Sequence, residues 1–368
     1  MEPRINIFIP VYKESDLLEE LLDALLRDPY DEKEILVIID EPTERSMDLS
    51  RRMDRDVRFI LNGKRLGKVN ALNNAIKQSE GEILLFLDSD VALSQKSFLK
   101  AIVEEMENAD IIEIKKKIIR DSFISRAVNY DYLSFNYTNW LFSRFLGRCL
   151  GFNGAAFAIK RETFHFLGGF RRVVCEDLDL GIRCFLNNIK FKYTENVEVQ
   201  NKVSPSWRQW FKQRKRWGIG LALWLREYYK DLLYSLRRYP RILMLSLIIL
   251  FPSLPLFIMN MAIPNELYLK LLSLLLIFLS THQLFWLPPI LLTTVGPSII
   301  KNFSASVITF MTYGIVFYYF SRKLGYTFNL LEFVFFYFIY NALWLLIIVV
   351  SIIRIIIWPE KINIDWKT

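Results

Sequence analysis

The sequence of 368 residues predicts a mainly parallel α/β domain followed by a membrane-associated C-terminal part. Over the first hundred residues, short apolar runs alternate with amphipathic stretches of about ten to fifteen residues, which is typical of βαβ units and a parallel sheet. From Ile242 onwards the chain contains uncharged runs of 18 residues or more, each long enough to cross the apolar part of a membrane. All Asp, Glu, Lys and Arg residues lie outside these runs.

Four short apolar runs in the N-terminal part are interpreted as buried strands, at residues 5–10, 34–40, 57–61 and 83–87. After the first, leucines spaced at i, i+3 and i+4 over Ser15–Arg27 predict an amphipathic helix with Ser15 as its N-cap. Parallel sheets bind ligands at the carboxyl ends of their strands, and Asp40 and Asp88 stand at two of these ends. Further helices are expected near 44–54, 67–79 and 177–188, and a strand near 156–160.

The charges divide the chain into three parts. The formal net charge is −4 over residues 1–201, +9 over 202–241 and +3 over 242–368. This segregation excludes a uniformly basic nucleic-acid binder, and the many aromatic and β-branched residues exclude disorder. We expect a cytosolic catalytic domain, basic aromatic interfacial helices and a transmembrane domain over these three ranges. Lys212, Arg214 and Lys215 are expected to contact lipid headgroups.

Four uncharged runs are candidate transmembrane helices: Ile242–Ala262, Leu271–Val295, Phe303–Phe320 and Phe333–Ile353. The second contains Pro288-Pro289, so three spans are an alternative, and a soluble helical bundle is another. The four runs predict a multi-pass protein of the cell membrane. Arginines beside the first run and the absence of a signal-peptide pattern predict that the catalytic domain lies on the cytosolic side. The aromatic segment Ser122–Arg148 is a further candidate for the membrane surface.

The candidate metal ligands are carboxylates rather than cysteines or histidines. The three cysteines lack paired spacing, and the two histidines are far apart in the sequence. Asp88-Ser89-Asp90 directly follows a buried apolar run. Two carboxylates at i and i+2 can hold one Mg²⁺ or Mn²⁺ that also binds a diphosphate. The alternative for this pair is a solvated acidic turn.

Several separated motifs occur in a characteristic order, namely INIFIPVYKES, ILVIIDEP, RLGKVNALNNAIKQSEGEILLFLDSDV, GFNGAAFAIKRETFHFLGGF, CEDLDLGIR and QRKRW. In order and spacing the chain resembles the membrane-bound family 2 glycosyltransferases over residues 4–220. That family includes cellulose, chitin and hyaluronan synthases and ceramide glucosyltransferases. The resemblance implies a GT-A fold with a mixed, mainly parallel sheet, a bound Mg²⁺ or Mn²⁺, and a nucleotide-sugar donor, which we expect to be a UDP-sugar.

The resemblance also implies roles for individual residues. The loop that lines the nucleotide base in the family is matched by Pro10, Val11 and Tyr12. The aspartate that contacts the uracil or ribose is matched by Asp40. Where the family often has a second Asp followed by Gly-Ser, Glu41-Pro42-Thr43 stands here. The remaining matches are Lys68 near the diphosphate, Asp88 and Asp90 on the metal, with Asp90 the expected direct ligand, and Phe152, Asn153 and Gly154 around the acceptor.

Two further motifs carry the chemistry that the resemblance implies. Asp177 matches the general base that takes the proton of the acceptor hydroxyl, and Glu176 matches a residue that orients or tunes it. The alternative is that both acids only begin a helix. In QRKRW, Gln213, Arg216 and Trp217 share one helix face. The family places Arg216 against the diphosphate and Trp217 under the acceptor, whereas the alternative is contact with headgroups alone.

The resulting function hypotheses belong to different classes. The leading one is an inverting glycosyltransferase that moves a sugar from a nucleotide sugar to the hydroxyl of a membrane lipid. A processive polysaccharide synthase is the alternative, but about four helices make a thin wall for a polymer channel. A non-enzymatic membrane scaffold would have lost a catalytic acid, and Asp40, Asp88, Asp90 and Asp177 are all present. No nucleic-acid partner is expected, and the oligomeric state is not indicated.

Overall fold

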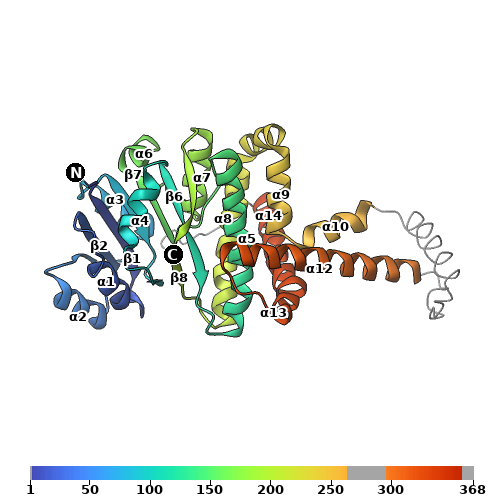
Figure 1. Ribbon diagram of the computed structural model, residues 1–368, viewed down its shortest axis with the longest axis horizontal. Helices are drawn as coiled ribbons and strands as arrows, with labels where there is room; N and C mark the ends of the chain where they lie inside the picture. Colours follow the sequence, from blue (N-terminus) through green and yellow to red (C-terminus); the bar gives the residue numbers. More distant parts are fainter. Residues whose placement is uncertain (1, 263–295, 359–368) are drawn as a thin grey trace.

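A computed structural model describes residues 2–262 and 296–358. The N-terminal part is built around a mixed eight-stranded sheet with the order β3-β2-β1-β4-β7-β6-β8-β5 (Figure 1). The first four strands pair in parallel, as the alternating pattern predicts, while β7 runs antiparallel to both β4 and β6. The strands are β1 Ile5–Tyr12, β2 Lys33–Asp40, β3 Arg58–Asn62, β4 Ile83–Leu87, β5 Val91–Leu93, β6 Ile111–Ile118, β7 Ala156–Lys160 and β8 Phe191–Asn201.

Helices cover both faces of the sheet and bury a hydrophobic core on each. The helices α1 and α4 pack on one face, and α3, α5 and α7 pack on the other. The predicted strands and helices of this part are confirmed to within a few residues at their ends. The helices are α1 Leu18–Leu26, α2 Glu44–Met53, α3 Lys68–Ile76, α4 Phe98–Met106, α5 Phe123–Leu146, α6 Arg161–Phe166 and α7 Glu176–Leu186.

The prediction that Ser15 caps the first helix is wrong. The helix α1 begins at Leu18, and its N-cap residue, Leu17, makes no side-chain cap hydrogen bond. The Ser15 hydroxyl instead donates to the carbonyl oxygen of Ser89 at 2.6 Å. A tertiary partner has therefore replaced the local one, and the hydroxyl ties the start of α1 to the acidic loop after β4.

The helix α5 connects the sheet to the apolar C-terminal helices. It packs on β6 and β8, and also on α9 (Pro240–Leu250), α12 (Gly296–Leu324) and α13 (Leu330–Phe335). Fourteen of its 24 residues are buried, so most of this helix lies between two layers of protein. The expectation that Ser122–Arg148 lies on a membrane surface is therefore wrong for most of this segment.

The apolar C-terminal segments form fewer spanning helices than predicted. Lys301–Leu324 and Leu330–Ile357 are the two helices of the described residues that are long and apolar enough to cross a membrane. The second of these combines α13, the π-helix η2 (Phe336–Tyr340) and α14 (Asn341–Ile357). The third and fourth predicted runs are thus confirmed as helices, while the run 271–295 lies outside the described residues.

The first predicted span, Ile242–Ala262, is wrong as a single helix. The helix α9 ends at Leu250, and α10 (Ser253–Ala262) begins after Pro252. Phe251 has φ −127° and ψ 76°, outside the helical region. Proline clashes with the backbone of the residue before it and holds that residue out of the helical conformation. A run without charges is therefore divided into two short helices.

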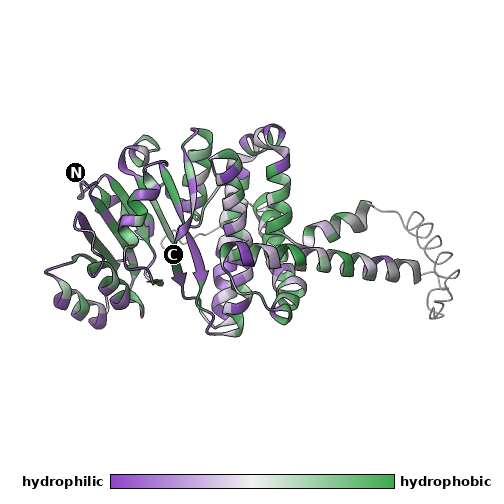
Figure 2. Ribbon diagram, in the orientation of Figure 1, coloured by the Kyte–Doolittle hydropathy of each residue, from purple (hydrophilic) through white to green (hydrophobic). Residues whose placement is uncertain are grey.

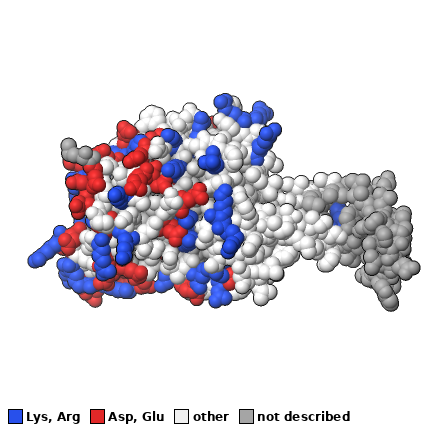
Figure 3. Space-filling view, in the orientation of Figure 1, with Lys and Arg blue, Asp and Glu red and all other residues white. Residues whose placement is uncertain are grey.

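Hydrophobic surface is concentrated on the C-terminal helices. Figure 2 shows α9, α12 and α14 in mainly hydrophobic colours. In Figure 3, charged side chains cover the sheet part, and the part that contains α12 is almost free of them on the face shown. Large apolar side chains are exposed along α12 and α14, including Phe303, Ile308, Met311, Ile315, Leu346, Val350, Ile353 and Ile356. Many exposed apolar side chains on one helix are typical of contact with lipid or another protein.

The long helix α8 (Trp207–Arg238) lies between α14 and the start of α7. A Cβ atom at Gly218 would lie 2.7 Å from Ser351 Oγ of α14, and one at Gly220 would lie 2.2 Å from Cys175 Sγ. Both positions therefore need glycine, because a side chain would push a neighbour away. These close approaches fix α8 against both neighbours.

Arg214 is buried in this packing, so the expectation that it contacts headgroups is wrong. Its side chain is 2% exposed, and its guanidinium lies 2.6 Å from Asp131 Oδ2. It also donates to the Tyr340 hydroxyl at 2.6 Å, and it lies 4.6 Å from the ring centre of Trp217. The basic residues in and just before QRKRW therefore differ in burial, with Lys212 and Lys215 exposed and Arg214 inside.

We expect Arg214→Ala to lower the free energy of unfolding by about 3 kcal/mol or more, because it leaves the Asp131 carboxylate without its buried partner. Chemical denaturation of the full chain in detergent measures this change. The matched control is Lys215→Ala, an exposed position of the same helix, with an expected change within about 0.5 kcal/mol. Equal effects of the two substitutions would show that Arg214 is not structurally important.

Candidate active site

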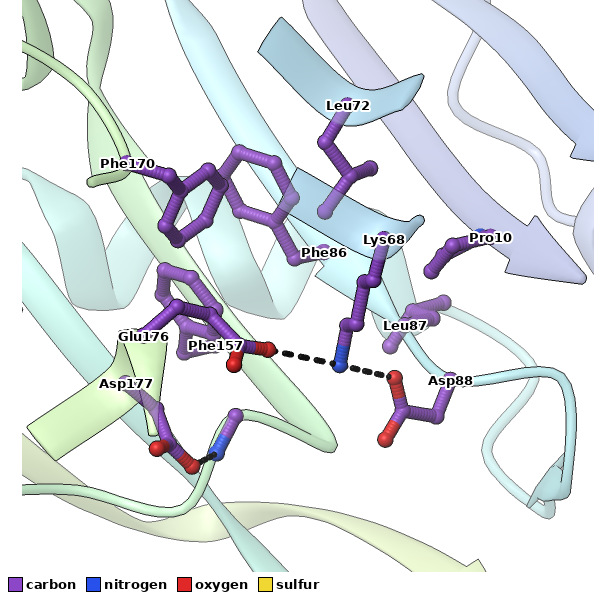
Figure 4. A pocket seen from close by; sticks show the side chains of 11 residues that line it. Pro10, Lys68, Leu72, Phe86, Leu87, Asp88, Phe157, Phe170, Glu176 and Asp177 are labelled. Carbon is purple, nitrogen blue, oxygen red and sulfur yellow. Dashed lines mark hydrogen bonds and ion pairs between the residues drawn. The ribbon is translucent and has the colours of Figure 1, made fainter. Parts of the chain in front are cut away.

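The candidate site lies at the carboxyl ends of β1, β2 and β4. Because β1 lies between the other two strands, Pro10 and Tyr12 at its end stand between Asp40 and Asp88. The start of α7 faces the same edge of the sheet. A narrow cavity of about 10 Å³ is lined there by Pro10, Lys68, Leu72, Phe86, Leu87, Asp88, Gly154, Phe157, Phe170, Glu176 and Asp177 (Figure 4). Apolar rings thus surround a few charged groups.

Lys68 joins the two acidic motifs. Its ammonium lies 2.7 Å from Asp88 Oδ1 and 3.3 Å from Glu176 Oε1 (Figure 4). Burial favours the neutral amine, but the charges of Asp88 and Glu176 outweigh it and raise the pKa of Lys68 above its ordinary value. The side chain is therefore a fixed cation at the point where the sequence predicts a diphosphate.

Asp177 is held by two backbone N–H groups. Gly154 N donates to its Oδ2 at 2.8 Å, and Leu178 N donates to its Oδ1 at 2.8 Å. Burial and the neighbouring Glu176 charge raise the pKa of Asp177 to about 6, although the two N–H bonds and Lys68 oppose this rise. A carboxylate with this pKa and a fixed orientation is suited to accept a proton near neutral pH.

The loop before β7 reaches Asp177 because two glycines permit a close backbone contact. A Cβ atom at Gly181 of α7 would lie 2.6 Å from the Cα of Gly151. The helix can therefore lie directly against the loop, and three residues later Gly154 meets Asp177. A Cβ atom at Gly154 would lie 3.0 Å from Asp177 Cβ and 3.1 Å from its Oδ2.

Phe152 and Asn153 shape this loop from within the protein. Phe152 is fully buried and its ring lies 4.7 Å from that of Phe157, so it supports the loop rather than offering a surface to an acceptor. Asn153 Oδ1 accepts a hydrogen bond from Ala155 N at 3.0 Å, and the side chain is also hydrogen-bonded to Tyr132. Of the three predicted acceptor residues, Gly154 lines the cavity.

Asp40 organises the loop that follows β3. Its carboxylate accepts hydrogen bonds from the Asn62 side chain at 2.9 Å, from Leu66 N at 2.9 Å and from Gly67 N at 2.7 Å. Gly67 is the N-cap of α3, so Asp40 sets the position at which Lys68 enters the helix. The structure thus shows Asp40 bonded to protein groups next to the predicted base pocket.

Tyr12 is exposed beside Asp40. The exposed fraction of Tyr12 is 46%, its hydroxyl donates to Glu41 Oε2 at 3.1 Å, and the Arg65 guanidinium lies 4.3 Å from its ring centre. Flat aromatic and guanidinium groups at the end of a parallel strand are suited to stack on a nucleotide base.

Asp88 and Asp90 are the two side chains that could hold a divalent ion. Although Asp90 is exposed, the atoms around its carboxylate desolvate it, and this effect with the Asp88 charge raises the pKa of Asp90 to about 7. Within the described residues, no three or more His, Cys, Asp or Glu side chains gather as a metal site. Two carboxylates fit Mg²⁺ or Mn²⁺ that completes its coordination with substrate phosphates and water.

The three residues of the QxxRW pattern lie on α8 near the start of α7. Arg216 is half-buried. Burial and the charges of Asp177 and Glu176 raise the pKa of the Cys175 thiol, and the Arg216 charge opposes this rise. Trp217 is half-buried on Arg214, while Gln213 is exposed. The structure therefore brings Arg216 near the residue that precedes Glu176, and Gln213 points to the surface.

Sequence reasoning assigned no role to the residues that hold the loops around the cavity. Asn73 donates to the Phe170 carbonyl oxygen at 2.9 Å, and Arg172 donates to Asn70 Oδ1 at 2.8 Å, so α3 anchors the loop that carries Phe170. Glu113 is fully buried in β6 and accepts a hydrogen bond from Asn153 N at 3.1 Å. The available signal for Glu113 was a single acid within the apolar start of IIEIKKKI.

Known proteins resemble both the sequence and the fold. The family described as "Glycosyl transferase family 2" matches residues 6–164. The match covers the strands β1 to β7 and ends within α6. The chain is 25% identical over 238 residues to a probable glycosyltransferase, YdaM, of Bacillus subtilis, covering 59% of this chain and 55% of the relative. It is 24% identical over 247 residues to a probable glucomannan 4-beta-mannosyltransferase 3 of Arabidopsis thaliana, covering 60% and 43%.

A bacterial polysaccharide synthase and a solved structure complete this comparison. The poly-beta-1,6-N-acetyl-D-glucosamine synthase of Staphylococcus epidermidis is 23% identical over 222 residues, covering 59% of this chain and 54% of the synthase. The chain thus spans about half the length of these relatives. The mannosyltransferase PcManGT of Pyrobaculum calidifontis, solved with GDP-Man and Mn²⁺, has a TM-score of 0.52 at 21% identity and covers 84% of this chain and 87% of that one. This similarity confirms the GT-A-like fold.

We expect Gly154→Ala to lower the transfer rate about 10²-fold, because its methyl group would displace the Asp177 carboxylate that the loop now orients. Steady-state release of nucleoside diphosphate by the purified full chain measures the effect. Gly63→Ala is the control, since a Cβ atom there meets no atom within 4 Å. An unchanged rate in Gly154→Ala would contradict the close placement of the loop and Asp177.

Proposed function

We propose that the protein is an inverting glycosyltransferase that moves a sugar from a nucleotide sugar to the hydroxyl of a membrane lipid. The placement of Asp177 carries this proposal, because a half-buried carboxylate with a pKa of about 6 lines the same cavity as Lys68 and Asp88. A base on one side and a phosphate-binding cation on the other are the two groups that inverting transfer needs. The resemblance favours a UDP-sugar as donor.

In the proposed reaction, the acceptor oxygen attacks the anomeric carbon while Asp177 takes its proton and the nucleoside diphosphate leaves from the opposite side. Glu176 keeps the pKa of Asp177 raised and holds Lys68. Lys68, joined by Arg216, stabilises the charge that builds on the leaving diphosphate. A divalent ion held by Asp88 and Asp90 would add a further positive charge there. The raised pKa of Asp177 matches its function as a base.

The surface of α8 supports a site next to a membrane. Trp207, Arg208, Phe211, Lys212 and Lys215 are exposed on its first turns. Aromatic rings together with cations are typical of helices at the headgroup level. The apolar surfaces of α12 and α14 add the contact with acyl chains. We therefore propose a protein of the cell membrane whose catalytic domain faces the cytosol, with the acceptor reaching Trp217 from the lipid.

The number of candidate membrane-spanning helices favours a lipid acceptor over a growing polymer. Within residues 2–262 and 296–358, two helices are long and apolar enough to span a membrane. A polysaccharide channel needs a wall of many helices, although two of the relatives described above are named for polysaccharide synthesis. Transfer of one sugar, or a few, onto a lipid requires no such channel.

We expect the rate of transfer to rise with pH through about 6, because Asp177 accepts a proton only when it is ionised. Glu176→Gln removes the neighbouring negative charge and should move this rise to lower pH. The dependence of kcat/KM on pH measures both, since it follows the free enzyme. Asp177→Asn should abolish transfer at every pH. If Asp177→Asn transferred as fast as the unchanged chain, Asp177 would not be the base.

The products identify the acceptor. Purified full chain in detergent, given Mn²⁺ or Mg²⁺ and a native lipid extract, is expected to release UDP from a UDP-sugar and to form a glycolipid of discrete mass. Mass spectrometry of the extract detects this product, with Asp177→Asn as the control. A ladder of masses would instead support a polysaccharide synthase. Release of GDP but not UDP from matched sugar donors would contradict the proposal that the donor is a UDP-sugar.

A further inference from the structure

A charged pair is buried directly behind the candidate site. Glu113 and Lys116, both on β6, are fully buried. Lys116 Nζ lies 2.8 Å from Glu113 Oε1, and it also donates to the Ile114 carbonyl oxygen at 3.1 Å. Burying two charges is costly unless each finds close partners. The pair therefore needs an explanation beyond the packing of the strand.

Both carboxylate oxygens of Glu113 accept hydrogen bonds, one of them from the loop before β7 that contains Asn153 and Gly154. Oε1 accepts the backbone N–H of Asn153 at 3.1 Å in addition to Lys116, and Oε2 accepts the side-chain amide of Asn139 on α5. The next residue after Asn153 is Gly154, whose N–H donates to Asp177 Oδ2 at 2.8 Å. A continuous path thus runs from the carboxylate of Glu113 through two consecutive peptide N–H groups to the proposed base.

The same strand is joined to the C-terminal helices. The Tyr326 hydroxyl, in the loop between α12 and α13, donates to the Lys116 carbonyl oxygen and is bonded to the Asn136 amide of α5. Glu113 therefore lies where the sheet, α5 and the loop of the apolar helices meet. It is fixed by groups from more than one layer of the protein.

We propose that Glu113 is a positioning residue for the proposed glycosyl transfer, and that it fixes the Asn153–Gly154 loop so that the Gly154 N–H orients Asp177. The inference rests on the proposed function. A carboxylate accepts a hydrogen bond from an N–H group more strongly than a neutral oxygen does. Because two consecutive N–H groups bind the two carboxylates, displacement of Asn153 also displaces Gly154.

Other charges also act on Asp177, and the experiment must keep their balance. Glu176 lies beside it on α7, Lys68 faces it from α3, and the Lys116 charge reaches it from β6. Arg216 of α8 lies near the preceding Cys175. Replacing Glu113 alone would leave Lys116 as an uncompensated buried cation, so both members of the pair are replaced together.

Two double variants separate the effect of the hydrogen bond accepted by residue 113 from the effect of the Glu113 charge. Glu113→Gln with Lys116→Met retains an oxygen that can accept the Asn153 N–H, whereas Glu113→Leu with Lys116→Met removes it. We expect the Gln form to keep kcat within about tenfold of the unchanged chain. The Leu form should lose about 10²-fold in kcat with an unchanged KM for the donor, because the Lys68 side of the site is untouched.

The pH dependence and amide exchange show whether the effect acts through the loop. Loss of the hydrogen bond from Gly154 N–H disfavours the ionised form of Asp177. The rise of kcat/KM with pH should therefore move to higher pH in the Leu form and stay in place in the Gln form. Hydrogen exchange of residues 152–155, measured by mass spectrometry, should be at least tenfold faster in the Leu form alone. Thermal unfolding of both variants shows that they fold.

The two proposals fail in different ways. Faster exchange in the Leu form, together with no transfer by the unchanged chain, would support the positioning by Glu113 and overturn the proposed function. Normal exchange and an unshifted pH profile in the Leu form, with transfer by the unchanged chain, would overturn the positioning by Glu113. If the Leu form does not fold, Asn139→Leu removes one anchor of the Glu113 carboxylate from α5, and unchanged exchange of 152–155 in that variant would also contradict the proposal.

Discussion

The ion pairs of Lys68 with Asp88 and Glu176 hold together two parts of the chain whose own charges would repel. Asp88 and Asp90 follow β4, whereas Glu176 and Asp177 begin α7. Burial raises the pKa of Asp90 and of Asp177, and the charges of Asp88 and Glu176 add to this rise. The 2.7 Å and 3.3 Å contacts of Lys68 offset part of this repulsion. Lys68 can lie there because Asp40 binds the N–H of Gly67 and so fixes the start of α3. The position of the acidic groups thus depends on the loop between β3 and α3, at the far end of the parallel strands.

Glycine contacts convert this charge arrangement into a defined geometry. Gly181 lets α7 lie against Gly151, and Gly220 lets α8 lie against Cys175 just before the two acids. Trp224 donates to the Leu178 carbonyl oxygen at 3.1 Å, and Tyr228 donates to Asp179 at 2.7 Å. The first turn of α7 is therefore enclosed by a loop on one side and by α8 on the other. Such packing limits the orientations open to Asp177.

Much of the nucleotide-binding half could be predicted from the sequence, because its strands and helices have strong local patterns. The apolar runs 5–10 and 83–87 and the leucine spacing of α1 each determine a type of element without information from distant residues. The acids at strand ends follow from the parallel order, and the structure brings Asp88, Glu176 and Asp177 to one cavity. The mixed sheet was expected through the resemblance, since β6 and β8 were not assigned from their patterns.

The errors occurred where a distant partner decides the outcome. Ser15 has the side chain of a cap but binds Ser89, and Arg214 has the charge of a headgroup ligand but pairs with Asp131. In Ile242–Ala262, a count of charges gave no weight to Pro252, which ends α9. Glu113 could not be assigned a function because its partners, Asn139 and Asn153, come from segments whose contact with β6 depends on the tertiary fold.

The burial of Arg214 changes the physical interpretation of the basic segment. A helix held only by headgroups could tilt without disturbing the site, but α8 is joined to Asp131 of α5 and to Tyr340 by the same guanidinium. At Gly220 it also contacts the residue before Glu176. The exposed Lys212 and Lys215 therefore lie on the same helix that contacts the residue before Glu176. The proposed attachment to lipid and the orientation of the proposed base would thus share one element, α8.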